Sequence, residues 1–218
     1  MKPLESLLLN REPISINYHK EEPKEELFET IAISQKTPRN LSYHQKRVDR
    51  TFKEYFQSSR TIDIKGSIQS YLKEQQLKQK QCYRLKITYS KNRVLKIAHF
   101  KYTPKAIKKI LLVEVANADY SYKFTQRKLF NILHKSFEAD EFIITKNGYL
   151  TDTTIANIAL YHKKERHWHT PKKPLLRGTV RERLLEKNKI IEKDIDYKSL
   201  GNYSNIALLN AMIDFKIL

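Results

Sequence analysis

The sequence predicts a mixed α/β (α+β) fold divided into two subdomains. Hydrophobic residues make up 40% and aromatic residues 11% of the 218 residues, which is enough for a packed core. Segments with strand and helix patterns alternate along the chain, with short connections between them. The character of the chain changes around Pro104. We therefore expect a small N-terminal α/β subdomain (1–104) and a larger C-terminal subdomain (105–218).

The N-terminal subdomain is predicted to hold three strands and two helices. Residues 27–33 (LFETIAI) are rich in β-formers and follow a charged, proline-containing stretch, 20–26, that favours an exposed turn. Ser42 precedes a helical pattern that places Val48 and Phe52 on one face. The remaining elements expected here are a helix at 67–78 and strands at 84–89 and 94–100.

The C-terminal subdomain is predicted to alternate strands with two helices. One helix is expected to start just after Lys123, and the other to follow Gly178. Asn147-Gly148 favours a tight turn. The expected strands are 110–115, 141–145, 155–161, 167–170 and 205–210.

Composition limits the classes of function. The net charge of +18 can indicate nucleic acid, an anionic membrane surface or small anionic molecules as partners, but it is spread over many segments, which favours a lysine-rich surface over a nucleic-acid-binding block. One cysteine, Cys82, permits no intrachain disulfide. No apolar run is long enough to cross a bilayer, and the N-terminus lacks a signal-peptide pattern, so a cytoplasmic protein is expected. The spacing of His162, His167 and His169 is weak evidence for a metal site, and none is predicted.

Three segments in the second half carry groups suited to catalysis. Lys123 lies next to Tyr122 and Phe124, where desolvation favours the neutral amine that a Schiff base needs, unless it is an ordinary surface lysine. Asp152 is the one acid in GYLTDTTIAN and can face a buried cation or form an Asx-turn. Gly178 precedes a helix whose first N–H groups can bind an anion or simply begin the helix.

In their order and spacing these segments resemble the class IV aminotransferase family, the fold-type IV enzymes of pyridoxal 5′-phosphate (PLP). The family pattern is a lysine before a helix, G-x-(V/L)-T-E-x-x-x-x-N-(I/L), a hairpin ending in T-P, and L-x-x-G-x-x-R. This chain has Lys123, GYLTDTTIANI, Thr170-Pro171 and LLRGTVR. In the first half, LFETIAI and LSYHQKR resemble the family's F-E strand and L-x-x-H-x-x-R helix start.

The resemblance implies a D-amino-acid-aminotransferase-like fold with PLP in the cleft between the subdomains. Lys123 would hold the cofactor covalently and move the substrate proton. Asp152 stands where the family has a glutamate beside the pyridine nitrogen, and Arg47 aligns with the phosphate-binding arginine. The other cofactor contacts implied are Thr153, Thr154, Gly178, and the backbone N–H groups of Thr179 and Val180.

Among the activities of the family, three features favour 4-amino-4-deoxychorismate lyase, which forms p-aminobenzoate and pyruvate. The chain is short, it has only four glycines, and Asn210-Ala211-Met212 resembles the lyase branch. These three residues and Arg84 are the candidate substrate contacts. A class IV aminotransferase acting on a branched-chain or D-amino acid is the close alternative, and a non-enzymatic basic nucleic-acid-binding protein the distant one. The expected partners are a small anionic substrate and a second copy of the chain in a homodimer, with no nucleic acid and no membrane.

Overall fold

The computed structural model describes residues 2–19 and 25–218, which fold into two compact units. The smaller unit consists of residues 25–104 and Tyr122–Gln126. The larger unit consists of residues 2–19, Lys105–Ser121 and Arg127–Leu218. Neither unit is one continuous stretch of chain. The turn predicted at 20–26 lies mostly outside the described residues.

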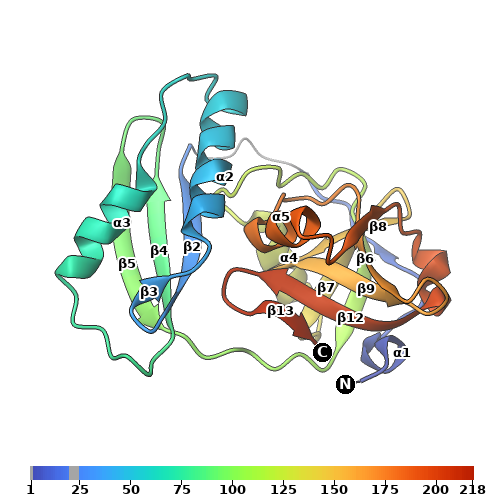
Figure 1. Ribbon diagram of the computed structural model, residues 1–218. Helices are drawn as coiled ribbons and strands as arrows, with labels where there is room; N and C mark the ends of the chain where they lie inside the picture. The colour runs from blue at the N-terminus through green and yellow to red at the C-terminus, as the bar shows by residue number, and fades with distance from the viewer. Residues whose placement is uncertain (1, 20–24) are drawn as a thin grey trace. The chain divides into compact units, whose positions relative to one another are not determined.

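The smaller unit is a four-stranded antiparallel sheet with two helices packed against it (Figure 1). Alternate side chains of a strand point to the same face of the sheet, and here one face is buried against the helices. Leu85 and Ile87, two residues apart in one strand, are therefore both fully buried. The strand order is β3 (Thr37–Pro38), β2 (Leu27–Ser34), β4 (Tyr83–Tyr89) and β5 (Val94–Lys101), and the helices are α2 (Leu41–Glu54) and α3 (Ile64–Lys73). The two helices and the strands β2, β4 and β5 confirm the predicted elements, but β3 was not predicted and α3 ends at Lys73, five residues before the predicted end. α3 begins three residues early because Asp63 caps it, accepting from the Gly66 N–H at 2.9 Å.

A short segment after Ser121 joins this sheet. The Phe28 N–H donates to the Lys123 carbonyl at 2.9 Å, and Leu27 and Phe124 form a β-bridge. The helix expected just after Lys123 therefore begins later, as α4 (Lys128–Ser136), and that prediction was wrong by about one turn. The backbone at Lys123 turns, with the Phe124 N–H donating to the Tyr122 carbonyl at 2.9 Å, and the hydrogen bond to β2 holds this turn at the sheet edge.

The larger unit contains a nine-stranded mixed sheet within the described residues (Figure 1). Its strands are β1 (Ile14–Ser15), β6 (Ile110–Glu114), β7 (Glu141–Lys146), β8 (Tyr149–Thr153), β9 (Asn157–His162), β10 (His167–Pro171), β11 (Ile191–Lys193), β12 (Tyr203–Asn210) and β13 (Asp214–Ile217). Its helices are α1 (Leu4–Leu7), α4, α5 (Thr179–Glu186) and a 3₁₀ helix, η1 (Tyr197–Asn202).

The start of the chain belongs to this larger unit, which differs from a single division at residue 104. β1 pairs in parallel with β6, and Leu4 and Leu7 of α1 are buried in the core beside Leu112 and Leu208. The sequence showed that these leucines are apolar but not which sheet they cover. The strands β8 and β13 were also not predicted, and β9 begins at Asn157, two residues later than expected. The turn at Asn147-Gly148 is confirmed, with positive φ at both residues.

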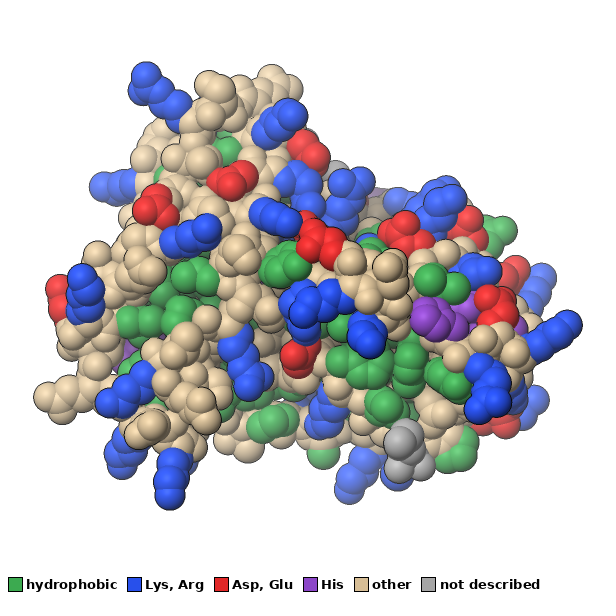
Figure 2. Space-filling model, viewed as in Figure 1, with side chains coloured by type: hydrophobic (Ala, Val, Ile, Leu, Met, Phe, Trp, Pro, Cys, Tyr) green, Lys and Arg blue, Asp and Glu red, His purple; other side chains and the backbone are tan. Residues whose placement is uncertain are grey.

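On the face shown in Figure 2, Lys and Arg side chains are scattered over several elements and do not form one block. No helix in the described residues is long and apolar enough to span a membrane.

Candidate active site

The structure divides the predicted site residues between the two units. Lys123, Arg47 and Arg84 belong to the smaller unit. The other predicted residues, which are Asp152, Thr153, Thr154, Gly178, Thr179, Val180, Asn210, Ala211 and Met212, belong to the larger unit.

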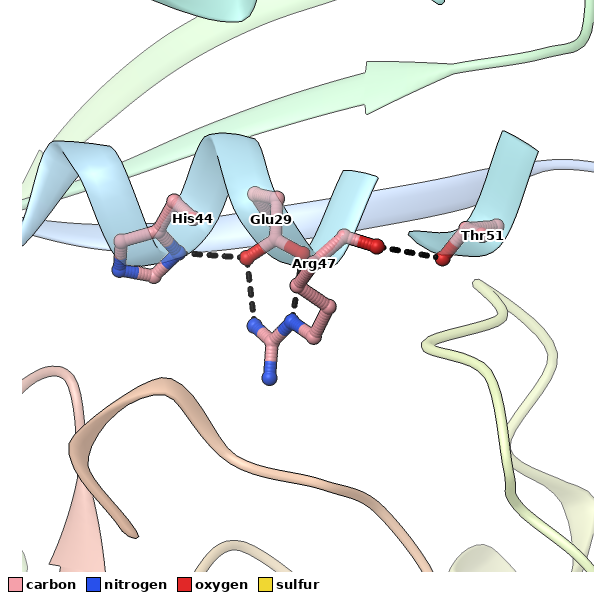
Figure 3. Close-up of polar contacts among 4 residues, drawn as sticks. All are labelled: Glu29, His44, Arg47 and Thr51. Carbon is pink, nitrogen blue, oxygen red and sulfur yellow. Dashed lines mark hydrogen bonds and ion pairs between the residues drawn. The ribbon is translucent and has the colours of Figure 1, made fainter. Parts of the chain in front are cut away.

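Arg47 lies at the centre of a buried network in the smaller unit (Figure 3). Its Nε donates to Glu29 Oε1 at 2.8 Å and its Nη2 to Glu29 Oε2 at 2.5 Å, a two-point pair between α2 and β2. His44 Nδ1 lies 2.6 Å from the same Oε2. Thr51 donates to the Arg47 carbonyl at 2.9 Å, one helical turn along α2. The network is fixed because His44 and Arg47 are at i and i+3, on the face of α2 that packs on β2.

The charges in this network are set by burial and proximity. Burial alone would raise the pKa of Glu29, but the Arg47 charge and the hydrogen bonds from His44 and Arg47 lower it to about 2. Burial lowers the pKa of His44, although Glu29 opposes that shift. Because an ionised carboxylate only accepts, the neutral His44 ring carries its proton on Nδ1. Its Nε2 is buried and has no hydrogen-bond partner among the described residues.

Lys123 lies near this network. Its Nζ is 4.7 Å from the centre of the Phe28 ring, and its charge contributes to lowering the pKa of His44. Phe28 is next to Glu29 on β2, so the strand that anchors Arg47 also supplies the surface under the lysine. A second lysine, Lys86 of β4, has its Nζ 4.8 Å from the same ring. The smaller unit thus carries both the predicted amine and the predicted phosphate-binding guanidinium.

Asp152 is the buried acid of the larger unit. It lies on β8 with 4% exposure, its Oδ1 accepting from Asn157 Nδ2 at 2.6 Å and its Oδ2 from the Leu176 N–H at 2.8 Å. Burial raises its pKa to about 6, against the lowering effect of these hydrogen bonds and of Arg181. Uncharged donors hold this carboxylate, in contrast to the guanidinium that faces Glu29.

Gly178 is held close to Asp152 through Asn157. Asn157 Nδ2 also donates to the Leu176 carbonyl at 2.7 Å, so the amide links β8 to the loop before α5. A Cβ on Gly178 would lie 1.9 Å from Asn157 Oδ1, which leaves room for glycine only. Gly178 is the N-cap of α5 and has no side chain that could accept a hydrogen bond from the first N–H groups of the helix. The N-cap residue therefore leaves these N–H groups to other acceptors.

The remaining predicted residues have other structural contacts. Thr153 and Thr154 are buried, and their hydroxyls donate to the Ala156 carbonyl and to Glu141 Oε1. Asn210 Oδ1 accepts from the N–H groups of the residues two and three positions later, which closes the turn between β12 and β13. Arg84 is exposed on β4, with its guanidinium 5.5 Å from the centre of the Phe100 ring. Their roles in binding cofactor or substrate stay predictions.

Sequence reasoning gave no role to Glu29 and His44. One signal could have found them: Glu29 is the only charged residue in LFETIAI, and a lone acid in an apolar strand needs a buried partner. The histidines of the β9–β10 hairpin lie in the larger unit, where the ring of His169 forms hydrogen bonds with Tyr203 and Glu165. Across residues 2–19 and 25–218 no group of three or more His, Cys, Asp or Glu could hold a metal.

The sequence and the fold of the chain are similar to those of known proteins. Residues 26–215 match the family model of class IV amino-transferases. An uncharacterized protein of Haemophilus influenzae is 35% identical over 187 residues, covering 85% of this chain and 97% of that protein. A crystal structure of a candidate 4-amino-4-deoxychorismate lyase from Haemophilus somnus is 34% identical, with a TM-score of 0.77, covering 86% of this chain and 96% of that one.

A more distant structure shares the fold. The PLP-bound form of a hypothetical aminotransferase from Mycobacterium tuberculosis has 14% identity and a TM-score of 0.69, covering 89% of this chain and 80% of that one. The chain belongs to the class IV aminotransferase family, and it is a PLP enzyme.

The residues present fit the chemistry of this cofactor. PLP has an aldehyde, a phosphate and a pyridine nitrogen, and the chain offers an amine at Lys123, a guanidinium at Arg47, and a buried carboxylate at Asp152. Asp152 has hydrogen bonds from neutral donors and a pKa raised by burial, which are the properties of a carboxylate that a cation would stabilise in its charged form.

Proposed function

We propose that this protein is a 4-amino-4-deoxychorismate lyase, which forms p-aminobenzoate and releases pyruvate as a step of folate biosynthesis. The similarity to the Haemophilus somnus candidate lyase, at 34% identity over 96% of that chain, carries the proposal. The Asn210-Ala211-Met212 turn and the four glycines of the chain support it. The substrate divides into its two products without an oxidant, a reductant or a second substrate.

In this proposal the smaller unit supplies the amine and the phosphate contact. Lys123 Nζ would hold the cofactor through its aldehyde and, once the amino group of the substrate has replaced it there, the free amine would take the proton from the substrate carbon that bears that amino group. The Phe28 ring lies under Nζ, 4.7 Å from it at the ring centre, and supports the side chain of the lysine. Arg47 binds the cofactor phosphate with a rigid, always charged fork.

The larger unit supplies the contacts to the cofactor ring and further phosphate contacts. Asp152 pairs with the pyridine nitrogen and keeps it protonated, although its side chain is one methylene shorter than the family's glutamate. The N–H groups of Thr179 and Val180 after Gly178 bind phosphate at the positive end of α5, and Thr153 and Thr154 add contacts next to Asp152. When bound, PLP supplies the electron sink that stabilises negative charge on the substrate carbon.

The substrate is a small anion, and the basic surface attracts it. Arg84 lies on the same face of β4 as Lys86, whose amine is over Phe28, and we propose that it binds a substrate carboxylate. The turn residues Asn210, Ala211 and Met212 are the proposed contacts from the larger unit. The net charge of +18 raises the local concentration of anions. We propose further that the enzyme is a cytoplasmic homodimer.

The proposal is tested by adding PLP and 4-amino-4-deoxychorismate to the purified protein, without any 2-oxo acid, and measuring the pyruvate released. Wild type should release pyruvate and Lys123→Ala should not. Lys86→Met is the matched control, because its amine lies over the same ring at nearly the same distance and has no proposed role in the reaction. It should retain activity within a factor of a few.

An inactive wild type that still turns yellow with PLP would contradict the lyase proposal. The next assay would then follow amino transfer from branched-chain or D-amino acids to a 2-oxo acid. That aminotransferase activity is the second candidate, because structures of a candidate amino-acid aminotransferase and a hypothetical aminotransferase share this fold.

A further inference from the structure

Glu29 is the deepest acid of the smaller unit and has no part in the proposed chemistry. It is fully buried on β2, and its two carboxylate oxygens accept hydrogen bonds from Arg47 and His44, both from α2. Figure 3 shows that both bonds from Arg47 leave one edge of the guanidinium, while its third nitrogen, Nη1, points away from Glu29 and His44. The carboxylate thus fixes the plane and the direction of the guanidinium.

Holding Arg47 in this way has an electrostatic disadvantage. A carboxylate paired to a guanidinium offsets much of the charge that an anionic phosphate would feel. A site built only for charge would leave Arg47 without an acid beside it. The presence of a buried, ionised acid at this position therefore indicates that the direction of the guanidinium matters more than its full charge.

We infer that Glu29 is a positioning residue for cofactor binding, which holds the Arg47 guanidinium so that Nη1 is directed at the phosphate. This inference rests on the proposed role of Arg47. His44 completes the arrangement, because its Nδ1–H donates to the Oε2 atom that also accepts from Arg47 and so prevents the carboxylate from rotating. Arg47 itself would contact the cofactor, and Glu29 would act only through it.

The experiment compares the affinity of the full-length cofactor-free protein for PLP with its affinity for pyridoxal, which lacks the phosphate. Binding is followed by absorbance, and the ratio of the two affinities isolates the phosphate contribution. In Glu29→Gln, the ratio should fall by roughly 10- to 100-fold, the range expected for losing a hydrogen bond to a charged group. Affinity for pyridoxal should stay within about two-fold of wild type, since its binding does not involve Arg47.

Two further variants separate geometry from charge and from folding. Glu29→Asp keeps the charge and shortens the reach, so positioning predicts a lower ratio, whereas a role in charge balance predicts the wild-type ratio. Removing one partner of a buried ion pair can prevent the protein from folding, so Glu29→Met/Arg47→Met, in which hydrophobic residues replace both partners, is compared with Arg47→Met. If Glu29 acts only through Arg47, the single variant Arg47→Met and the double variant should have the same ratio of PLP affinity to pyridoxal affinity. Glu54→Gln, an exposed acid at the end of α2, is the matched control.

The outcomes distinguish the inference from the function on which it rests. If Arg47→Met keeps the wild-type ratio, Arg47 does not bind the phosphate, and both proposals for these residues fail. If Arg47→Met lowers the ratio but Glu29→Gln and Glu29→Asp keep or raise it, only the positioning role is overturned. Equal losses of PLP and pyridoxal affinity in the Glu29 variants would indicate a purely structural residue and would also overturn it.

Discussion

At the scale of single residues, Glu29 and Asp152 are both buried carboxylates, yet their pKa values move in opposite directions. The pKa of Glu29 falls to about 2 because a guanidinium outweighs the effect of burial. The pKa of Asp152 rises to about 6 because burial outweighs the amide donors around it. Glu29 already has its counter-ion within the chain, whereas Asp152 gains most from a cation that a ligand brings.

The raised pKa of Asp152 predicts how the cofactor-free protein responds to pH. The folded state holds its proton more tightly than the unfolded state, so the stability from this group is present below about pH 4 and is lost as the pH rises to about 6. The loss should be roughly 3 kcal/mol at 1.36 kcal/mol per pKa unit. Urea unfolding at pH 4.5 and pH 7 should show that wild type loses more stability than Asp152→Asn. An equal loss of stability between the two pH values in wild type and Asp152→Asn would contradict the raised pKa of Asp152.

Glu29 predicts the opposite dependence. Its folded pKa of about 2 lies below the ordinary value of 4.5, so its stabilisation is present above pH 4.5 and is lost as the pH falls towards 2. Acid unfolding followed by circular dichroism should be steeper for wild type than for Glu29→Met/Arg47→Met, which has no titrating pair. A double variant that is equally acid-sensitive would show that this pair does not govern the transition.

At the scale of elements, Asn157 at the start of β9 connects the carboxylate on β8 to the loop before α5. One amide nitrogen serves Asp152 and the Leu176 carbonyl, and its oxygen occupies the space where a side chain at position 178 would be. The glycine is required by this packing and not by its backbone, since its φ is −78°.

This packing predicts that Gly178→Ala lowers the melting temperature and weakens PLP binding, because the methyl group would displace Asn157 and with it Asp152. We expect a destabilisation of about 1–3 kcal/mol, typical of overpacking. Gly201→Ala is the matched control, since a Cβ there meets nothing within 4 Å. The substitution Asn157→Ala should lower the free energy of unfolding less in the Gly178→Ala variant than in wild type. Additive losses would mean that the clash is not the cause.

The sequence predicted most elements of the fold and the identity of the cofactor, but not the contacts that place the site residues. Strands such as 27–33 and the helix after Ser42 were found because apolar periodicity reports burial directly. β8 was not found, because its polar Thr151, Asp152 and Thr153 are buried by hydrogen bonds that no periodicity encodes. The partnership of Glu29 with Arg47 is likewise a contact between distant segments.

At the scale of the whole molecule, the beginning of the chain completes the larger unit. Leu7 is 1% exposed in the core of that unit, and Leu9 is 48% exposed two residues later. The N-terminal segment is short, but it covers apolar surface that would otherwise meet water.

This assignment predicts a sharp contrast between two neighbouring leucines. Leu7→Ala should reduce the free energy of unfolding by about 2–5 kcal/mol, the usual cost of a cavity in a packed core. Leu9→Ala should change it by less than about 0.5 kcal/mol, as surface substitutions do. Denaturant titrations of both variants give the two values. A Leu7→Ala protein as stable as wild type would place the first helix outside the core.

The pairing of Lys123 with β2 also has a consequence for synthesis of the protein on the ribosome. The strands and helices between residues 25 and 104 emerge as one stretch, but the edge of β2 that Lys123 and Phe124 occupy waits until those later residues are translated. β1 must similarly wait for β6, almost a hundred residues downstream. The nascent chain therefore acquires Lys123, the proposed cofactor lysine, on β2 only after the rest of that sheet has had time to form, so we expect the proposed site to be completed late in folding.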